Sequence, residues 1–198
     1  TDDIYEKIIY ENNKFYTLAQ VEPKLKNRTL TLNGVSKAYC MTGWRLGYAG
    51  GPKNIIAAMN KIQSQSTTST SSITMAASVE ALNGNQDFII DHNVEFKKRR
   101  DMVVKNLNLA KGISCSLPTG AFYVYPNCQG CLGKKTEKGK IINSDEDFMN
   151  YLLETEGIAG VHGEAFGMSP YFRISYAASY EILEDACKRI INACEKLI

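Results

Sequence analysis

The segment Leu30-Thr-Leu-Asn-Gly-Val35 most constrains the fold of this 198-residue chain, because it has the pattern of a buried strand that runs into a loop. A helical pattern follows from Pro52 to about Ser64, with apolar residues three and four positions apart at Ile55, Ile56, Met59 and Ile62. A strand, a loop and a helix in this order predict an α/β unit. The loop carries Lys37 just beyond the C-terminal end of the strand, where open α/β sheets bind ligands.

The composition changes near residues 83–87, where Asn83-Gly-Asn85 ends a second predicted helix over residues 73–82. The Ser/Thr-rich residues 64–72 connect the two helices. We therefore expect residues 1–84 to form the C-terminal part of a larger α/β domain. We expect residues 87–198 to form a smaller α+β domain.

Alternating helix and strand patterns fill this second part. Asp87 is expected to cap a helix that reaches about Leu109, Ser144 opens a second helix, and Ser179 caps the last one. The last helix carries an apolar stripe at Leu183, Cys187, Ile190, Ile191 and Cys194. Strands are predicted over residues 113–116, 121–125, 158–161 and 171–176.

Composition excludes several classes of function. The net charge is +2 with acidic and basic residues interleaved, and the basic run at residues 97–100 lies in a helical pattern, so we expect no nucleic-acid partner. No apolar stretch approaches the roughly 20 residues of a membrane span. The six cysteines do not have the spacing of a secreted disulfide framework, so we expect free thiols in a reducing cytoplasm. The single pair Cys128 and Cys131 lacks a second pair, so we expect no metal.

The loop after the first strand holds residue types suited to a phosphorylated aldehyde. The Lys37 amine can form an imine with an aldehyde when it loses its proton. Ser36 offers a hydroxyl and Arg45 a planar fork of donors, and both suit a phosphate. From residue types alone, ordinary solvated side chains remain the alternative.

The spacing Ser36-Lys37, followed by Gly43-Trp-Arg45-Leu-Gly47-Tyr48, resembles the lysine motif of the aminotransferase family of fold-type I pyridoxal-phosphate (PLP) enzymes. The resemblance covers the whole chain, with further matches at Asp2-Asp-Ile-Tyr5, Pro118-Thr-Gly-Ala-Phe-Tyr123, Gly163-Glu-Ala-Phe-Gly167 and Arg173-Ile-Ser-Tyr176. Gly34 and the absence of Arg and Lys from residues 63–72 favour the bacterial-type aspartate aminotransferase branch.

The resemblance implies that Lys37 binds PLP covalently and then moves a proton as base and acid. It implies that Asp2 pairs with the pyridine nitrogen of the cofactor, which keeps the ring able to accept electrons. Tyr5 would hydrogen-bond the 3-oxygen of the ring. Asp2 and Tyr5 lie at the start of the chain, where fraying is the alternative.

The resemblance also implies that Ser36 and Arg45 contact the cofactor phosphate and that Arg173 binds the substrate α-carboxylate with two parallel hydrogen bonds. Ser36 could instead cap a turn. Arg173 lies in an alternating strand pattern, where an ordinary salt bridge is the alternative.

The implied activity is transfer of an amino group between an L-amino acid, aspartate first, and a 2-oxo acid, 2-oxoglutarate first, in a homodimer. Prephenate or an aromatic oxo acid is an alternative substrate. Because the chain begins at Thr1 and has no candidate for the family's phosphate loop or ring-stacking aromatic residue, we expect a truncated product that is inactive alone. Other readings are a PLP lyase or synthase on the same scaffold, or a non-catalytic aminotransferase-like module.

Overall fold

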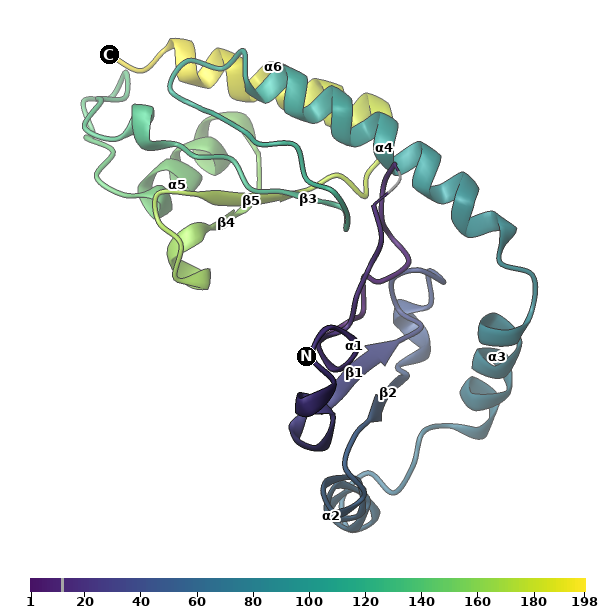
Figure 1. The fold of residues 1–198 in the computed structure, drawn as a ribbon. Helices are drawn as coiled ribbons and strands as arrows, with labels where there is room; N and C mark the ends of the chain where they lie inside the picture. The colour runs from purple at the N-terminus through teal and green to yellow at the C-terminus, as the bar shows by residue number, and fades with distance from the viewer. Residues whose placement is uncertain (12) are drawn as a thin grey trace. The chain divides into compact units, whose positions relative to one another are not determined.

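The computed structural model describes residues 1–11 and 13–198. The chain divides into two compact units, Thr1–Asn93 and Val94–Ile198 (Figure 1). The boundary between the units falls inside helix α4 (Asp87–Leu107). The domain division expected at residues 84–87 stays a prediction.

The first unit is built around an antiparallel pair of strands, β1 (Thr31–Gly34) and β2 (Gly47–Gly50). The start of the chain lies beside β1 in the parallel direction. The Asp3 N–H donates to the Leu32 carbonyl at 2.8 Å, and the Leu32 N–H donates to the Thr1 carbonyl at 2.8 Å. Because parallel segments run the same way, the residues that follow Asp3 and those that follow β1 leave at the same end.

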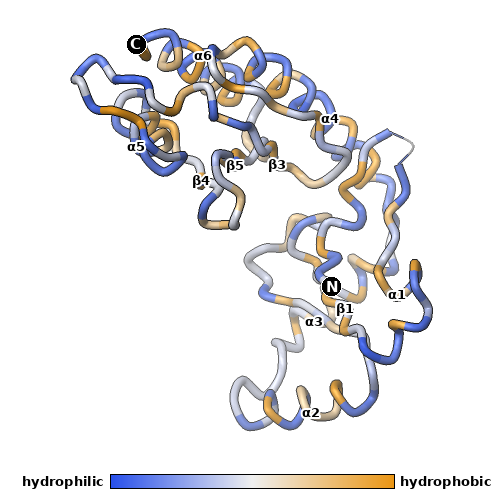
Figure 2. Tube along the Cα trace, turned by 60° about the vertical axis from the view of Figure 1, so that its left-hand side comes forward, coloured by the Kyte–Doolittle hydropathy of each residue, from blue (hydrophilic) through white to orange (hydrophobic). Residues whose placement is uncertain are grey.

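Five helical segments complete the first unit together with the start of α4. They are α1 (Leu18–Val21), the 3-10 helix η1 (Pro23–Arg28), the 3-10 helix η2 (Thr42–Trp44), α2 (Lys53–Ser64) and α3 (Ser72–Asn83). Figure 2 shows hydrophobic and hydrophilic residues alternating along α2. None of the residues of α2 is buried, and Ile62 is 71% exposed. The apolar residues of α2 therefore lack the cover that a helix of this pattern normally has.

The second unit contains a three-stranded antiparallel sheet in the order β3-β5-β4. Its strands are β3 (Tyr123–Val124), β4 (Val161–His162) and β5 (Phe172–Ser175). The second unit also contains the helices α5 (Asp145–Glu156) and α6 (Tyr180–Glu195) and the short 3-10 helices η3 (Gln129–Cys131) and η4 (Gly163–Phe166). Large apolar side chains form its core, among them Leu107, Val124, Phe148, Leu152, Phe172 and Ile190.

Both serine caps expected in the second unit are present. The Ser144 hydroxyl accepts a hydrogen bond from the Asp147 N–H at 3.1 Å at the start of α5. The Ser179 hydroxyl accepts one from the Ile182 N–H at 3.4 Å at the start of α6. Each bond satisfies a donor that the first helical turn leaves without a partner.

The strand expected over residues 113–116 is wrong. Only Ser114 forms a bridge, with Asn127, and no ladder continues from it among the described residues. The Asn108 side chain explains the difference, since it donates to the Cys115 carbonyl and accepts from the Cys115 N–H, both at 2.9 Å. A side chain thus takes the backbone groups that a ladder would use.

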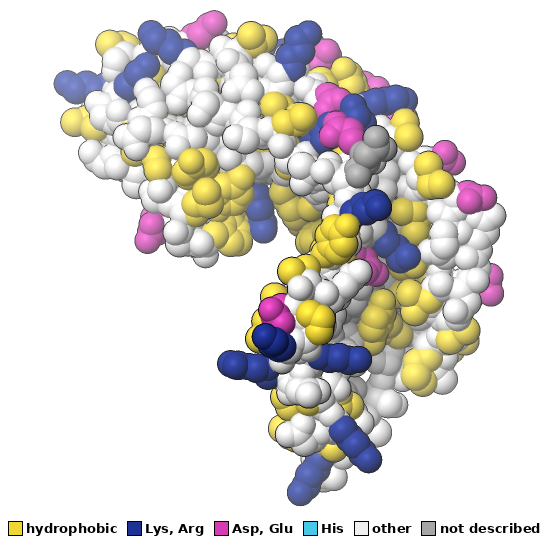
Figure 3. Space-filling model, viewed as in Figure 1, with side chains coloured by type: hydrophobic (Ala, Val, Ile, Leu, Met, Phe, Trp, Pro, Cys, Tyr) yellow, Lys and Arg dark blue, Asp and Glu magenta, His cyan; other side chains and the backbone are white. Residues whose placement is uncertain are grey.

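Helix α4 begins at Asp87 itself, so Asp87 is a helical residue and not the expected cap. Its N–H donates to the side-chain oxygen of Asn85 at 2.6 Å, so a residue two positions before the helix supplies the acceptor. No helix in the described ranges is both long and apolar enough to cross a membrane. On the face shown in Figure 3, Lys and Arg side chains are interspersed with acidic and hydrophobic ones.

Candidate active site

Lys37 lies in a turn that directly follows β1. The turn is closed by a hydrogen bond from the Cys40 N–H to the Lys37 carbonyl at 3.2 Å, and it begins next to the fully buried Val35. Lys37 is half-buried, and its Nζ lies 5.9 Å from the centroid of the Tyr5 ring. The structure therefore brings together two residues that the sequence had placed in one site.

Asp2 is part of the same arrangement through its pairing with β1. It forms a parallel bridge with Leu32, and its carboxylate accepts a hydrogen bond from the Ile4 N–H at 3.2 Å. The amino group of Thr1 donates to the Leu30 carbonyl at 2.9 Å. These bonds hold the first residues against β1, in place of the frayed end that the sequence left open.

Ser36 and Arg45 lie at the same end of the β1–β2 pair. Gly34 pairs with Gly47, so Ser36 follows the pair on one strand and Arg45 precedes it on the other. Arg45 is exposed, and its Nη1 donates to the Thr42 carbonyl at 2.7 Å. The register thus places Ser36, Lys37 and Arg45 around one end of the sheet.

The backbone of residues 37–45 is strained at two places. Cys40 has a φ of 54° and Arg45 a φ of 52°, both in the left-handed region that side chains disfavour. Strain of this kind costs on the order of 1–3 kcal/mol per residue and gathers at ligand sites. The surrounding structure stabilises this loop against that cost.

Arg173 belongs to the second unit. It lies half-buried in the middle of β5, and its guanidinium carbon is 4.5 Å from the Tyr123 ring centroid and 4.4 Å from the Phe166 ring centroid. In residues 1–11 and 13–198, no carboxylate lies within ion-pair distance of Arg173. The salt bridge that the sequence left open for Arg173 is therefore not found among the described residues.

Sequence reasoning missed the aromatic residues around Arg173. Tyr123 and Phe166 lie inside two of the motifs quoted above, so their place in those motifs was the available signal. Tyr125 is a third neighbour, with its ring centroid 6.1 Å from that of Phe166. Burial raises the pKa of Tyr125, while the positive charge of Arg173 acts in the opposite direction.

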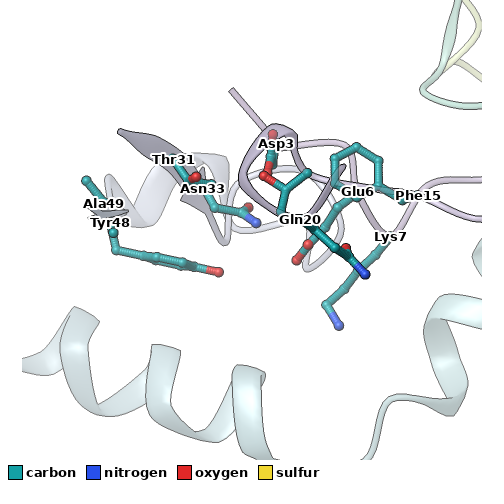
Figure 4. Close-up of a pocket in the computed structure, with 11 residues that line it drawn as sticks. Asp3, Glu6, Lys7, Phe15, Gln20, Thr31, Asn33, Tyr48 and Ala49 are labelled. Carbon is teal, nitrogen blue, oxygen red and sulfur yellow. The ribbon is translucent and has the colours of Figure 1, made fainter. Parts of the chain in front are cut away.

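A cavity of about 590 Å³ lies in the first unit beside the sheet, but none of the expected site residues lines it. Figure 4 shows Asp3, Glu6, Asn33 and Tyr48 around it. Burial and the nearby Glu6 carboxylate raise the pKa of Tyr48. The lining of the cavity includes Lys7 but neither Lys37 nor the phosphate ligands expected from the sequence, Ser36 and Arg45.

Comparison with known proteins identifies what the chain resembles. A family model described as aminotransferase class I and II matches residues 1–190. A probable aspartate/prephenate aminotransferase of Rhizobium leguminosarum bv. phaseoli is 59% identical over 194 residues, which are 98% of this chain and 48% of that protein. The chain spans about half the length of the curated relatives it matches.

Solved structures agree. The crystal structure of the aspartate aminotransferase from Rhizobium meliloti has a TM-score of 0.96 and 56% identity, covering 99% of this chain and 49% of that one. The Thermus thermophilus aspartate aminotransferase with maleate has a TM-score of 0.84 and 35% identity, covering 97% of this chain and 47% of that one. These likenesses confirm the fold-type I α/β class expected from the sequence. Since the family model covers nearly all of its residues, the chain belongs to the aminotransferase class I and II family.

Proposed function

We propose that the protein containing this chain transfers an amino group between an L-amino acid, aspartate first, and a 2-oxo acid, 2-oxoglutarate first. The observation that carries the proposal is the turn after β1, where Lys37 lies next to Tyr5 and beside the segment of Asp2. The names of the relatives, aspartate and aspartate/prephenate aminotransferases, support the same substrates, with prephenate as an alternative oxo acid.

PLP is the cofactor that these residues fit. When bound, it supplies an aldehyde carbon for an amine and a ring that accepts electrons from the substrate Cα–H bond. Lys37 would hold the cofactor covalently through its amine, and the same amine would accept and return the proton of the substrate Cα. Lys37 is half-buried in the turn after β1 and lies next to the Tyr5 ring, and this position supports the role.

Asp2 and Tyr5 serve the ring of the cofactor. The Asp2 carboxylate would keep a proton on the pyridine nitrogen by its charge, and the Tyr5 hydroxyl would donate a hydrogen bond to the 3-oxygen. Their placement depends on the parallel pairing of residues 1–3 with β1, which fixes where the Asp2 segment leaves the sheet. The contact between Tyr5 and Lys37 supports a shared site.

Ser36 and Arg45 bind the phosphate, and Arg173 binds the substrate carboxylate. The register of the β1–β2 pair supports the first assignment, because it places both side chains at the end of the sheet that carries Lys37. The lack of an ion-pair partner for Arg173 among the described residues supports the second, because a planar guanidinium without a protein carboxylate is available to one from a ligand.

We further propose that the active protein is a cytoplasmic homodimer. The apolar residues that α2 and α3 expose support an interface, with Ile62 and Ile73 exposed by 71% and 73%. All six cysteines are free thiols, which supports a reducing compartment.

Trapping of the cofactor tests the proposal. The intact protein is loaded with PLP, reduced with borohydride and digested, and the peptides are mapped by mass spectrometry. We expect the pyridoxyl mass on Lys37 and its loss in the Lys37→Arg variant. A label on Lys7 or on any other lysine would overturn the assignment. In parallel, oxaloacetate formation from aspartate and 2-oxoglutarate reports the reaction itself.

A further inference from the structure

Two aromatic rings flank Arg173, one from β3 and one from η4, the 3-10 helix that follows β4. Tyr123 lies on β3, whose residue 123 pairs with Ser175, so Tyr123 and Arg173 are diagonal neighbours on one face of the sheet. Phe166 ends η4, which directly follows β4 on the other side of β5. The two rings lie 4.5 and 4.4 Å from the guanidinium carbon, well within the range of a cation–π contact.

Such contacts orient a guanidinium without using its hydrogen-bond donors. An aromatic face attracts the cation through the charge distribution of the ring and offers no lone pair in the plane of the guanidinium. Arg173 therefore keeps its fork of N–H groups for a ligand while the rings restrict its rotation. A carboxylate partner from the protein would have consumed the same donors.

The segment that carries Tyr123 is held by two buried side chains. Arg100 is 1% exposed, and its Nη1 donates to the Pro118 carbonyl at 2.8 Å. The hydroxyl of the buried Tyr176 donates to the Ala121 carbonyl at 3.0 Å. Ala121 has a φ of 58°, so these bonds also hold a disfavoured backbone conformation directly before Tyr123.

The segment that carries Phe166 is held by a buried carboxylate. Asp145, which is 1% exposed, accepts a hydrogen bond from the Glu164 N–H at 2.9 Å and one from the Ser169 hydroxyl at 3.2 Å. The first bond fixes the start of η4, and the second fixes the chain just beyond its end. Phe166 lies between these two points.

We propose that Tyr123 and Phe166 form an aromatic clasp that positions Arg173 for the carboxylate of the substrate. The two rings are positioning residues and act through Arg173. The inference rests on the proposed function, since it assigns the specificity for an α-carboxylate to the way this arginine is held.

Loss of one ring should weaken binding of substrate more than it slows the reaction. For Phe166→Leu and Tyr123→Leu in the intact, PLP-loaded protein, we expect KM for aspartate to rise about tenfold, in line with the strength of a partly desolvated cation–π contact, while kcat changes less than about threefold. The matched variants Phe166→Tyr and Tyr123→Phe keep a ring at each position and should behave like the unchanged protein.

A second measurement does not depend on activity. Phenylglyoxal modifies guanidinium groups, and peptide mapping gives the rate for Arg173 alone. We expect the leucine variants to be modified several times faster than the ring-keeping variants, and the absorbance of the bound cofactor to stay unchanged. Unchanged KM and unchanged modification rates in both leucine variants would overturn the clasp.

The outcomes separate the two proposals. If the PLP-loaded, unchanged protein forms no oxaloacetate from aspartate and no product from other amino acids, the proposed function fails, and the role of the clasp toward substrate fails with it. If the protein is active but both leucine variants keep the original KM and the original modification rate of Arg173, the function stands and the clasp alone is wrong. A rise in KM with faster modification of Arg173 supports both.

Discussion

The Nζ of Lys37 lies 5.9 Å from the centroid of the Tyr5 ring, although the residues are on separate segments of the first unit. The pairing of residues 1–3 with β1 produces this contact. We predict that Tyr5→Phe keeps the ring beside Lys37 but removes the hydroxyl that, in the proposed function, stabilises the 3-oxygen of PLP. A hydrogen bond to a charged group contributes about 1.5–3 kcal/mol, and about 1.4 kcal/mol corresponds to one pKa unit.

The pKa of the Lys37–PLP linkage should therefore rise by roughly one unit or more in Tyr5→Phe, because the Tyr5 hydroxyl stabilises the deprotonated form of the linkage. A pH titration of cofactor absorbance in the intact protein gives the value. Tyr10→Phe is the control, since Tyr10 is a buried tyrosine of the same unit that is not assigned to the site. An unshifted titration in Tyr5→Phe would remove Tyr5 from the site.

The 198-residue chain on its own should be a poor aminotransferase. It spans about half the length of its relatives, and the apolar residues of α2 lack cover. Purified chain mixed with PLP, aspartate and 2-oxoglutarate should form oxaloacetate at less than about a hundredth of the rate of the intact protein, which corresponds to a loss of about 3 kcal/mol in transition-state stabilisation. Comparable rates would show that these residues suffice.

Only Cys40 should react promptly with a thiol reagent in the native chain. Cys40 is exposed and the other five cysteines are buried. Burial raises the pKa of Cys115 and Cys187 to about 11 and that of Cys128 to about 12, so these thiols stay protonated at pH 8.

Ellman's reagent at pH 8 should therefore titrate one thiol per chain, and all six after the chain is unfolded in guanidinium. Cys40→Ser should abolish the prompt phase. A second prompt thiol in that variant would show that a buried cysteine opens readily.

Asp147 should make the stability of the second unit depend on acid. The N–H of Asn143 donates to its carboxylate at 3.1 Å and lowers the pKa of Asp147, with Lys140 adding a favourable charge at 3.3 Å. A lowered pKa means that the stabilisation is complete above the unfolded value, about 3.9, and is lost as the pH falls through the lower folded value.

Asp147→Asn should therefore cost about 1 kcal/mol at pH 7, by urea unfolding of the chain, and less near pH 2. Asp185→Asn is the comparison, because Asp185 is 65% exposed in its pair with Arg189 and such pairs contribute less than about 0.5 kcal/mol. An equal cost of Asp147→Asn at both pH values would contradict the role of its charge.

Gly163 should tolerate no side chain. A Cβ there would press on the Met168 carbonyl oxygen and lie 2.6 Å from the Tyr171 carbonyl oxygen, and both oxygens belong to the backbone. Gly163→Ala should cost about 3 kcal/mol in thermal or urea unfolding, at the upper end of overpacking. Gly43→Ala, where a Cβ meets nothing within 4 Å, should cost less than about 1 kcal/mol. Equal costs would show that the turn at Gly163 adjusts.

The sequence predicted the elements whose signals are local. Helix α2 spans Lys53–Ser64 as its periodicity indicated, and the serine caps of α5 and α6 form the expected bonds. Four residues of the predicted stripe on α6 are buried, and only Ile191 remains half-buried. Periodicity and capping depend on neighbouring residues in the chain, so they can be recognised in the sequence before the fold is known.

Features that depend on contacts outside the local sequence pattern could not be predicted from the sequence. The strand expected at residues 113–116 fails because Asn108 competes for the backbone of Cys115. Strand β2 (Gly47–Gly50) has few β-branched residues to signal it, and it forms because β1 supplies a partner. The rings around Arg173 come from β3 and η4, which are far apart in the chain, so spacing alone did not connect them.

Arg45 has a left-handed backbone conformation, which disfavours a side chain, and it also carries the guanidinium that we assign to the phosphate. Engineering of this residue therefore sets stability against cofactor binding. Glycine at this position would relax the backbone and stabilise the chain by about 1 kcal/mol, but it would remove the guanidinium that we assign to the phosphate. Selection of variants for heat resistance alone would therefore favour a replacement that discards cofactor affinity. A screen that couples heating to retention of PLP would keep Arg45 and direct the improvement elsewhere.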